Sequence, residues 1–91
     1  MSRNIEHHPE ARRFEWKENG MLCVLDYELD NNVMTIIHTG VPRPVGGRGI
    51  AADLTRCALD TARENGWKVR PLCSYAAAYI RRYDEYADLV V

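Results

Sequence analysis

The sequence lacks the features that mark several common protein classes. It has no C-x-x-C pair, and its three cysteines, Cys23, Cys57 and Cys73, are an odd number that suits a disulfide framework badly. We therefore expect reduced thiols and a cytoplasmic location. No apolar run approaches the roughly 20 residues that span a bilayer, and residues 1–8 lack the apolar core of a signal peptide.

An excess of charge of either sign is also missing. Twelve basic and 13 acidic residues give a net charge of −1, which argues against an extended nucleic-acid or anionic-membrane surface. A local phosphate site stays possible, because it needs only a few groups. His7 and His8 lie in a polar end without a second group of ligands nearby, so we interpret them as a surface pair and expect no metal site.

The length sets the domain organisation. A chain of 91 residues is enough for one domain, residues 1–91, with one core. The oligomeric state cannot be read from the sequence, and we favour a monomer.

The first half of the chain predicts an antiparallel meander of three strands. Residues 13–17 alternate polar and apolar side chains, and Asn19 and Gly20 form a typical two-residue hairpin turn because both tolerate positive φ. Residues 21–29 form the returning strand. Residues 33–39, rich in β-branched side chains, form the third.

The second half predicts a helix, a strand and a short helix. The first helix starts near Arg48 or Gly49 and stops at residues 65–66, Asn-Gly. Residues 67–72 form a strand that joins the sheet in parallel through a right-handed crossover. Ser74 is the expected N-cap of a short helix that ends at Arg82. The fold class is therefore α+β. Residues 83–91 are left unassigned, apart from one further turn.

The segment between the third strand and the first helix predicts an anion site. Residues 45–51 combine a glycine-rich turn with a helix start, where unpaired amides and the helix dipole attract negative charge. The spacing fits neither the Walker loop nor G-x-G-x-x-G. A plain loop whose glycines only turn the chain is the alternative.

The sequence Gly46-Gly47-Arg48-Gly49-Ile50-Ala51 resembles the pyrophosphate loop, Q/R-x-x-G-x-G/A, of the GCN5-related N-acetyltransferases. Together with residues 38–42, 71–75 and 78–82, it is similar to a minimal subfamily of about this length, the YidJ-like or NATD1-like small acetyltransferases. The resemblance runs from about Glu10 to Leu89. Where the family usually has Arg or Gln, this chain has Gly46, so we expect weaker donor binding rather than lost function.

The resemblance implies a binding site for acetyl-CoA. Its diphosphate would contact the amides of Gly46, Gly47, Arg48, Gly49, Ile50 and Ala51. Its pantetheine arm would pair with the backbone of Thr39 and Val41, where two parallel strands splay apart. Arg43 or Arg48 is a candidate substitute for the missing side chain at Gly46.

Residues at the start of the last helix are also expected in the groove. These are Ser74, Tyr75 and Tyr79. The two tyrosines share a face at i, i+4 spacing. The alternative is that they only pack this helix onto the sheet.

Two side chains are candidate catalysts. Cys73 ends a strand before a helix start, which lowers a thiol pKa, and it is a candidate nucleophile or acid; the alternative is an apolar filler. His38 lies near the strand end, where a neutral imidazole could act as general base. The alternative is a rim histidine that bonds a carbonyl.

These features predict an acetyl-CoA-dependent N-acetyltransferase that acts on an amine, with direct transfer ranked before an acetyl-Cys73 route. The acceptor is not identified, although a peptide or protein amine suits a chain this short. The alternative is a CoA-binding regulatory or interaction module with little turnover.

Overall fold

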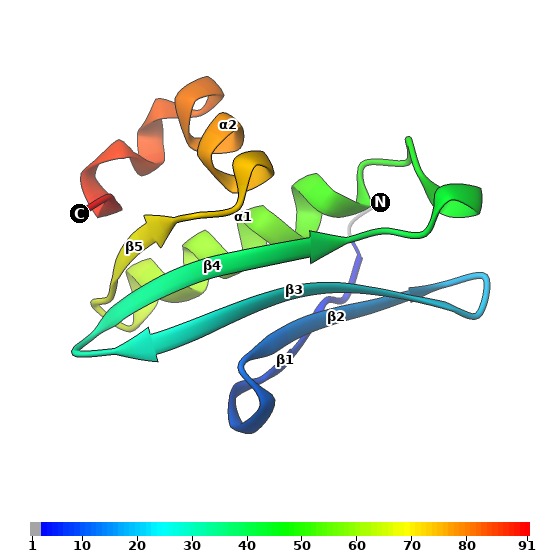
Figure 1. The fold of residues 1–91 in the computed structure, drawn as a ribbon, viewed down its shortest axis with the longest axis horizontal. Coiled ribbons are helices and arrows are strands. Elements are labelled where there is room, and N and C mark those ends of the chain that lie inside the picture. Colours follow the sequence, from blue (N-terminus) through cyan, green and yellow to red (C-terminus); the bar gives the residue numbers. More distant parts are fainter. Residues whose placement is uncertain (1–2) are drawn as a thin grey trace.

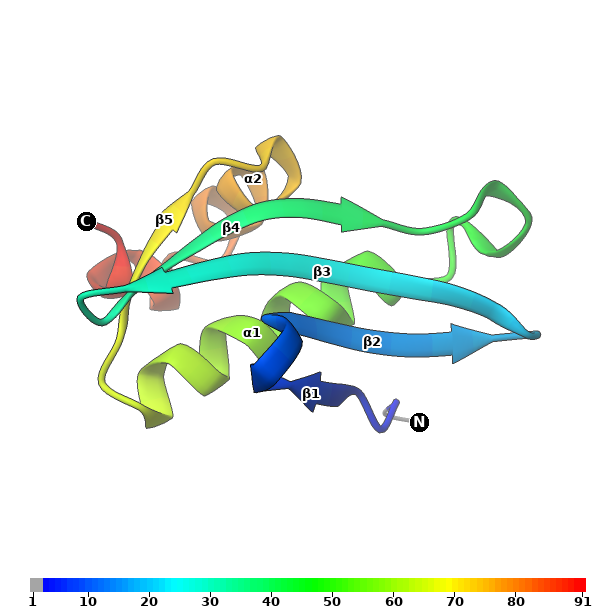
Figure 2. The same cartoon turned by 60° about the horizontal axis from the view of Figure 1, so that its bottom comes forward.

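The computed structural model describes residues 3–91 and is built around one mixed sheet of five strands (Figures 1 and 2). The strand order follows the sequence. The first four strands pair antiparallel, and the fifth is parallel to the fourth. The strands are β1 (Glu6–His8), β2 (Arg13–Glu18), β3 (Met21–Asp30), β4 (Val33–Gly40) and β5 (Lys68–Pro71).

Two α-helices and three short 3-10 segments complete the described part of the chain, residues 3–91. They are α1 (Ile50–Glu64), α2 (Ser74–Arg82), η1 (Pro9–Ala11), η2 (Arg43–Val45) and η3 (Asp84–Leu89). The helix α1 is the crossover between β4 and β5 and runs behind the sheet in Figure 1. The predicted α+β class, with its parallel strand after a crossover helix, is confirmed.

The core lies between α1 and one face of the sheet. The alternation along β3 places Cys23, Leu25 and Tyr27 on this covered face, and all are buried. From α1, Leu54 and Ala58 pack onto them as part of the same apolar cluster. The opposite face of the sheet carries mainly charged and polar side chains, so it is the open face of the molecule.

The strand β1 was not expected from the sequence. Its His7 pairs opposite Phe14, stacks on that ring at 4.1 Å, and places Nε2 2.6 Å from the Tyr27 hydroxyl. Burial, and then the proximity of His8, lowers the pKa of His7. The interpretation of both histidines as a surface pair is therefore wrong for His7, which packs on the covered face.

The helix starts differ slightly from expectation. The helix α1 begins at Ile50 with Gly49 at its N-cap, one residue beyond the predicted limit. The prediction of Ser74 as N-cap is wrong, because Cys73 holds that position and Ser74 is the first residue of α2.

The end of the chain folds back onto α1 and β5. The Tyr86 hydroxyl donates to Asp60 at 2.7 Å, and Arg63 bonds both Asp88 and the Glu85 carbonyl. These contacts fix η3 against the C-terminal half of α1.

Candidate active site

The strands β4 and β5 separate after Ile36. Their parallel pairing runs only from Val33 opposite Lys68 to Ile36 opposite Pro71. The Ile36 carbonyl then accepts from the amides of Leu72 and Cys73, at 3.1 and 3.0 Å. Beyond this point β4 continues while the chain after β5 turns away into α2, as Figure 1 shows. Beyond Ile36, no strand among the described residues pairs with this edge of β4.

A β-bulge lies at the same place. Tyr27 is opposite Ile36 and Asp26 is opposite His38, so Ile37 is an extra residue in β4. The extra residue reverses the alternation of side chains. Ile36 points to the covered face, but the next residue on that face is Thr39, opposite the buried Leu25.

The backbone of Thr39 faces the gap between the strands. The Tyr27 amide donates to Arg12, so Tyr27 and Leu25 direct their backbone groups toward β2, and Asp26 directs its groups toward β4. His38 therefore faces β3, and Thr39 faces the gap. Continued alternation gives Val41 the same direction, which agrees with the implied contacts to pantetheine.

Cys73 fills the mouth of this gap. Its sulfur lies 3.6 Å from the Thr39 hydroxyl. Burial acts to raise the pKa of Cys73, but hydrogen bonds from the Ala76 amide and the Thr39 hydroxyl outweigh it and lower the pKa. The amides of Tyr75 and Thr39 add to this effect. The sulfur thus sits among donors at the start of α2, which favours the thiolate.

His38 lies on the other face of the sheet. It pairs opposite Asp26, whose carboxylate accepts from Arg13 at 2.7 Å, and its side chain is exposed. Gly40 leaves room for the imidazole, because a Cβ there would lie only 2.9 Å from His38 Nε2. His38 and Cys73 therefore flank the end of β4 from opposite faces and are not brought into contact.

The glycine-rich loop leaves a row of free amides. The Gly46 amide donates to Arg43, and the Asp53 amide to Gly49. Within residues 3–91, the amides of residues 47–52 have no backbone acceptor, and Gly49 supplies no side-chain cap to α1. Gly47 and Gly49 adopt φ of 77° and 80°, which other residues rarely do. These exposed amides at a helix start suit an anion.

The two candidate substitutes for the missing loop side chain, Arg48 and Arg43, lie in different surroundings. Arg48 donates from Nη1 to Glu18 at 3.0 Å, so its guanidinium is held at the end of β2. The idea that Arg48 replaces the missing Arg or Gln is therefore not supported. Arg43 is exposed in η2.

A groove borders the first turn of α1. It has a volume of about 350 Å³ and is lined by Ala52, Tyr75, Ala78, Tyr79, Arg82 and Tyr83. Burial raises the pKa of both Tyr75 and Tyr79, which keeps their hydroxyls protonated. Ser74 is exposed beside this groove. The two tyrosines thus lie where the sequence expects the cofactor groove, although Tyr79 also packs on the core.

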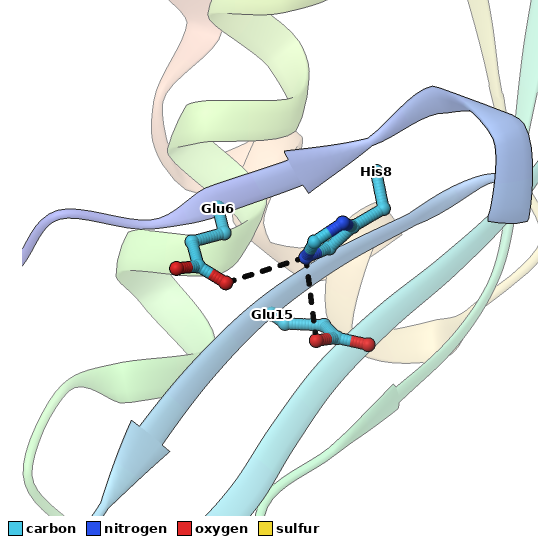
Figure 3. Close-up of side chains that lie close together, drawn as sticks. All are labelled: Glu6, His8 and Glu15. Atoms are coloured by element: carbon cyan, nitrogen blue, oxygen red, sulfur yellow. Dashed lines mark hydrogen bonds and ion pairs between the residues drawn. The ribbon is translucent and has the colours of Figure 1, made fainter.

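A separate cluster of charged side chains lies on the open face, at β1 and β2. His8 Nε2 is 3.3 Å from Glu6 and 3.4 Å from Glu15 (Figure 3). The expectation that no further ligand groups lie near His8 is therefore wrong for the folded chain. Arg13 lies 3.7 Å from Glu15. Glu15 thus has a cationic partner within the chain.

The geometry agrees with the comparisons to known proteins. The family described as GCN5-related N-acetyl-transferase matches residues 13–89. The chain belongs to this family.

Individual members of the family extend the match. Protein NATD1 of Mus musculus is 35% identical over 80 residues, which cover 85% of this chain and 73% of the mouse protein. Protein NATD1 of Homo sapiens is also 35% identical, with 71% of its length covered. The solution structure of a GCN5-like protein from Staphylococcus aureus superposes with a TM-score of 0.76 at 31% identity, covering 97% of this chain and 87% of that one. The resemblance to NATD1-like small acetyltransferases is confirmed.

Two features of this candidate site could not be predicted from the sequence. The bulge at Ile37 has no glycine or proline to mark it, and only the pairing of β3 with β4 reveals it. The contacts of Glu18 and Arg3 to the loop join residues far apart in sequence. No described helix is long and apolar enough to cross a membrane.

Proposed function

We propose that this chain is an acetyl-CoA-dependent N-acetyltransferase that moves the acetyl group to an amine. One observation carries the proposal. The gap beside Thr39 lies at the start of the segment that joins β4 to α1, and the free amides of residues 47–52 lie at its end. A ligand with an extended amide-containing arm and a diphosphate needs both features. Membership of the acetyltransferase family supports the same ligand.

The residues at the gap suit the chemistry of a thioester. The pantetheine arm would add to the free edge of β4 by backbone hydrogen bonds, as an extended peptide adds to a sheet. That edge leads to the Thr39 amide and Cys73, so the acetyl group would lie near these two groups. A backbone amide aimed at the thioester carbonyl stabilises the negative charge that forms on its oxygen.

The open face offers the route for the amine. His38 lies there at the end of β4, exposed, so it could accept the proton as the amine attacks the carbonyl carbon and CoA leaves as its thiolate. This arrangement favours direct transfer with both substrates bound. In the second route, the Cys73 thiolate attacks first and releases CoA as its thiolate. The amine then attacks the acetyl-cysteine, and its proton passes to the departing Cys73 sulfur.

The acceptor we propose is an amine on a peptide or protein. Within residues 3–91, no helix covers the open face of the sheet, so no enclosed pocket for a small molecule forms around His38. Exposed apolar side chains at Leu22 and Ile37 give this face some area for contact with a larger partner.

Calorimetry with CoA and a free-thiol release assay with acetyl-CoA and peptide amines test the proposal. The variant Gly49→Ala strains the loop at φ 80°, and Gly20→Ala applies matched strain in a hairpin turn at φ 77°. An added Cβ meets nothing within 4 Å at either position. We expect weaker CoA binding for Gly49→Ala alone, by about tenfold.

The outcomes separate the two functions. A wild-type chain that binds no CoA at millimolar concentration contradicts the proposal. Tight CoA binding without acetyl transfer to any amine selects the regulatory or interaction module instead.

A further inference from the structure

The glycine-rich loop has little to hold it in shape. Three of its four residues, Gly46, Gly47 and Gly49, have no side chain, and all four are exposed. Glycine loses more conformational freedom on ordering than any other residue. A loop that is ordered only on binding would weaken the complex by that entropy. Contacts from outside the loop therefore decide whether its amides are arranged in advance.

Arg3 makes one of these contacts from the segment before β1. Its Nη2 donates to the Arg48 carbonyl at 2.7 Å, and its Nη1 bonds the Asp53 carboxylate in the first turn of α1. Its Nε lies 3.9 Å from Glu18, the same residue that holds the Arg48 side chain. The side chain of Arg3 is only 18% exposed, so the guanidinium is packed in place. One guanidinium thus joins the loop to the helix that follows it.

The contact at the Arg48 carbonyl acts directly on a free amide. That carbonyl and the Gly49 amide belong to one planar peptide unit. A charged donor on the oxygen therefore fixes the direction of the Gly49 N–H and strengthens it as a donor. The Gly49 amide is in the row without a backbone acceptor.

The contact at Asp53 acts through charge. A carboxylate in the first turn of α1 repels a diphosphate at the same helix start. Asp53 bonds Arg3 and also accepts from Arg56 at 2.9 Å. These two cations offset its negative charge near the loop.

We infer that Arg3 is a positioning residue for the diphosphate of the acyl donor. It acts through the loop and the first turn of α1, and not by direct contact with the diphosphate. It fixes the Arg48–Gly49 peptide and offsets the charge of Asp53. This inference rests on the proposed function, since it concerns the same acetyl-CoA site. Gly46 has no side chain that could hold the loop in shape. In this inference, Arg3 holds the loop instead.

The test compares Arg3→Met with Arg63→Met. Arg63 also bridges a carboxylate, that of Asp88, and a main-chain carbonyl, that of Glu85, but in the C-terminal half of α1. We expect Arg3→Met to raise the Kd for CoA and the KM for acetyl-CoA about tenfold, with kcat at saturation unchanged. Arg63→Met should leave both constants within about twofold of wild type. Amide exchange at Gly49, followed by NMR without ligand, should be faster in Arg3→Met only.

A conservative variant separates the two effects of Arg3. Lysine keeps the charge beside Asp53, but its single ammonium lacks the fork that reaches two acceptors. We expect Arg3→Lys to recover part of the lost affinity. In an Asp53→Asn background, Arg3→Met should cost less than in wild type, because the carboxylate to be offset is gone.

Several results would overturn the inference. Equal KM values for wild type and Arg3→Met would do so while leaving the proposed function standing. A loss of kcat without a change in KM would place Arg3 in a different role. A wild-type chain that binds no CoA overturns both the inference and the proposed function.

Discussion

The two halves of β4 have the same kind of sequence but different surroundings. Residues 33–36 pair with β3 on one side and β5 on the other, whereas residues 38–40, beyond the bulge at Ile37, pair with β3 alone. The first half holds the sheet together, and the second half leaves one backbone edge free next to Cys73. The difference shows that the candidate site begins where β4 and β5 cease to pair. The bulge at Ile37 marks this boundary.

Two adjacent isoleucines give the sharpest test of this boundary. Ile36 is fully buried and Ile37 is 45% exposed. We expect Ile36→Ala to lower the free energy of unfolding by about 3 kcal/mol, because it removes core contacts and leaves a cavity. Ile37→Ala should lower it by less than about 1 kcal/mol. Urea denaturation measures both, and equal losses would show that Ile37 is packed like its neighbour.

His38 tests the separation of the two faces. If it is the base, His38→Gln should lower kcat about a hundredfold. The KM for acetyl-CoA should not change, because the imidazole lies on the open face, away from the groove. Steady-state kinetics with a peptide amine give both constants. A raised KM for acetyl-CoA would mean that the imidazole reaches the donor and that the faces are not separate.

The reactivity of the three cysteines gives a comparison between the gap, where Cys73 lies, and the core. The pKa of Cys73 is lowered, whereas burial raises the pKa of Cys23 and Cys57. Iodoacetamide at pH 7 should therefore alkylate Cys73 at least about ten times faster than either of the others. Peptide mass mapping follows each site, and saturating CoA should slow only Cys73.

The pH dependence of the same thiol has a definite sign. The folded pKa of Cys73 lies below the unfolded one, so the thiolate stabilises the folded chain above the unfolded pKa. This contribution is lost as the pH falls through the folded pKa. The alkylation midpoint of Cys73 should accordingly lie below that of free cysteine, and a midpoint above it would contradict the described hydrogen bonds.

We expect the smallest effect from a substitution at Thr39. Thr39→Val keeps the shape of the side chain and removes the hydroxyl that lies 3.6 Å from the Cys73 sulfur. The pKa of Cys73 should rise slightly, and alkylation at pH 7 should slow about two- to threefold. The free energy of unfolding should change by less than about 1 kcal/mol. No change in the alkylation rate would mean that the backbone amides alone hold the thiolate.

Much of this arrangement follows from local sequence patterns. The Asn19-Gly20 turn, the β-branched strand before Gly40 and the i, i+4 spacing in α1 each predict their element from short-range chemistry. The glycine-rich turn predicts its free amides for the same reason.

The orientation of the site does not follow from those patterns. Strict alternation would place His38 on the same face as Ile36, next to the groove. The extra residue at Ile37 reverses this and brings Thr39 there instead. The register between β3 and β4 determines where such a bulge lies. The sequence of β4 alone therefore does not predict it.

Long-range contacts account for the remaining differences. The segment Glu6–His8 is too short and polar to predict a strand, and it becomes one because His7 stacks on Phe14. The ion pair between Arg48 and Glu18 likewise forms only in the folded chain. In each case the deciding partner lies at least seven residues away in sequence.

Val90 and Val91 affect whether copies of the protein can associate through the edge of the sheet. Val90 forms a parallel bridge with Val69, and the Val91 amide donates to the Val69 carbonyl at 3.1 Å. An uncovered strand at the rim of a sheet is a template for edge-to-edge aggregation. Val90 and Val91 pair with the outer rim of β5 at Val69, so the Val69 carbonyl is not left open to a neighbouring molecule.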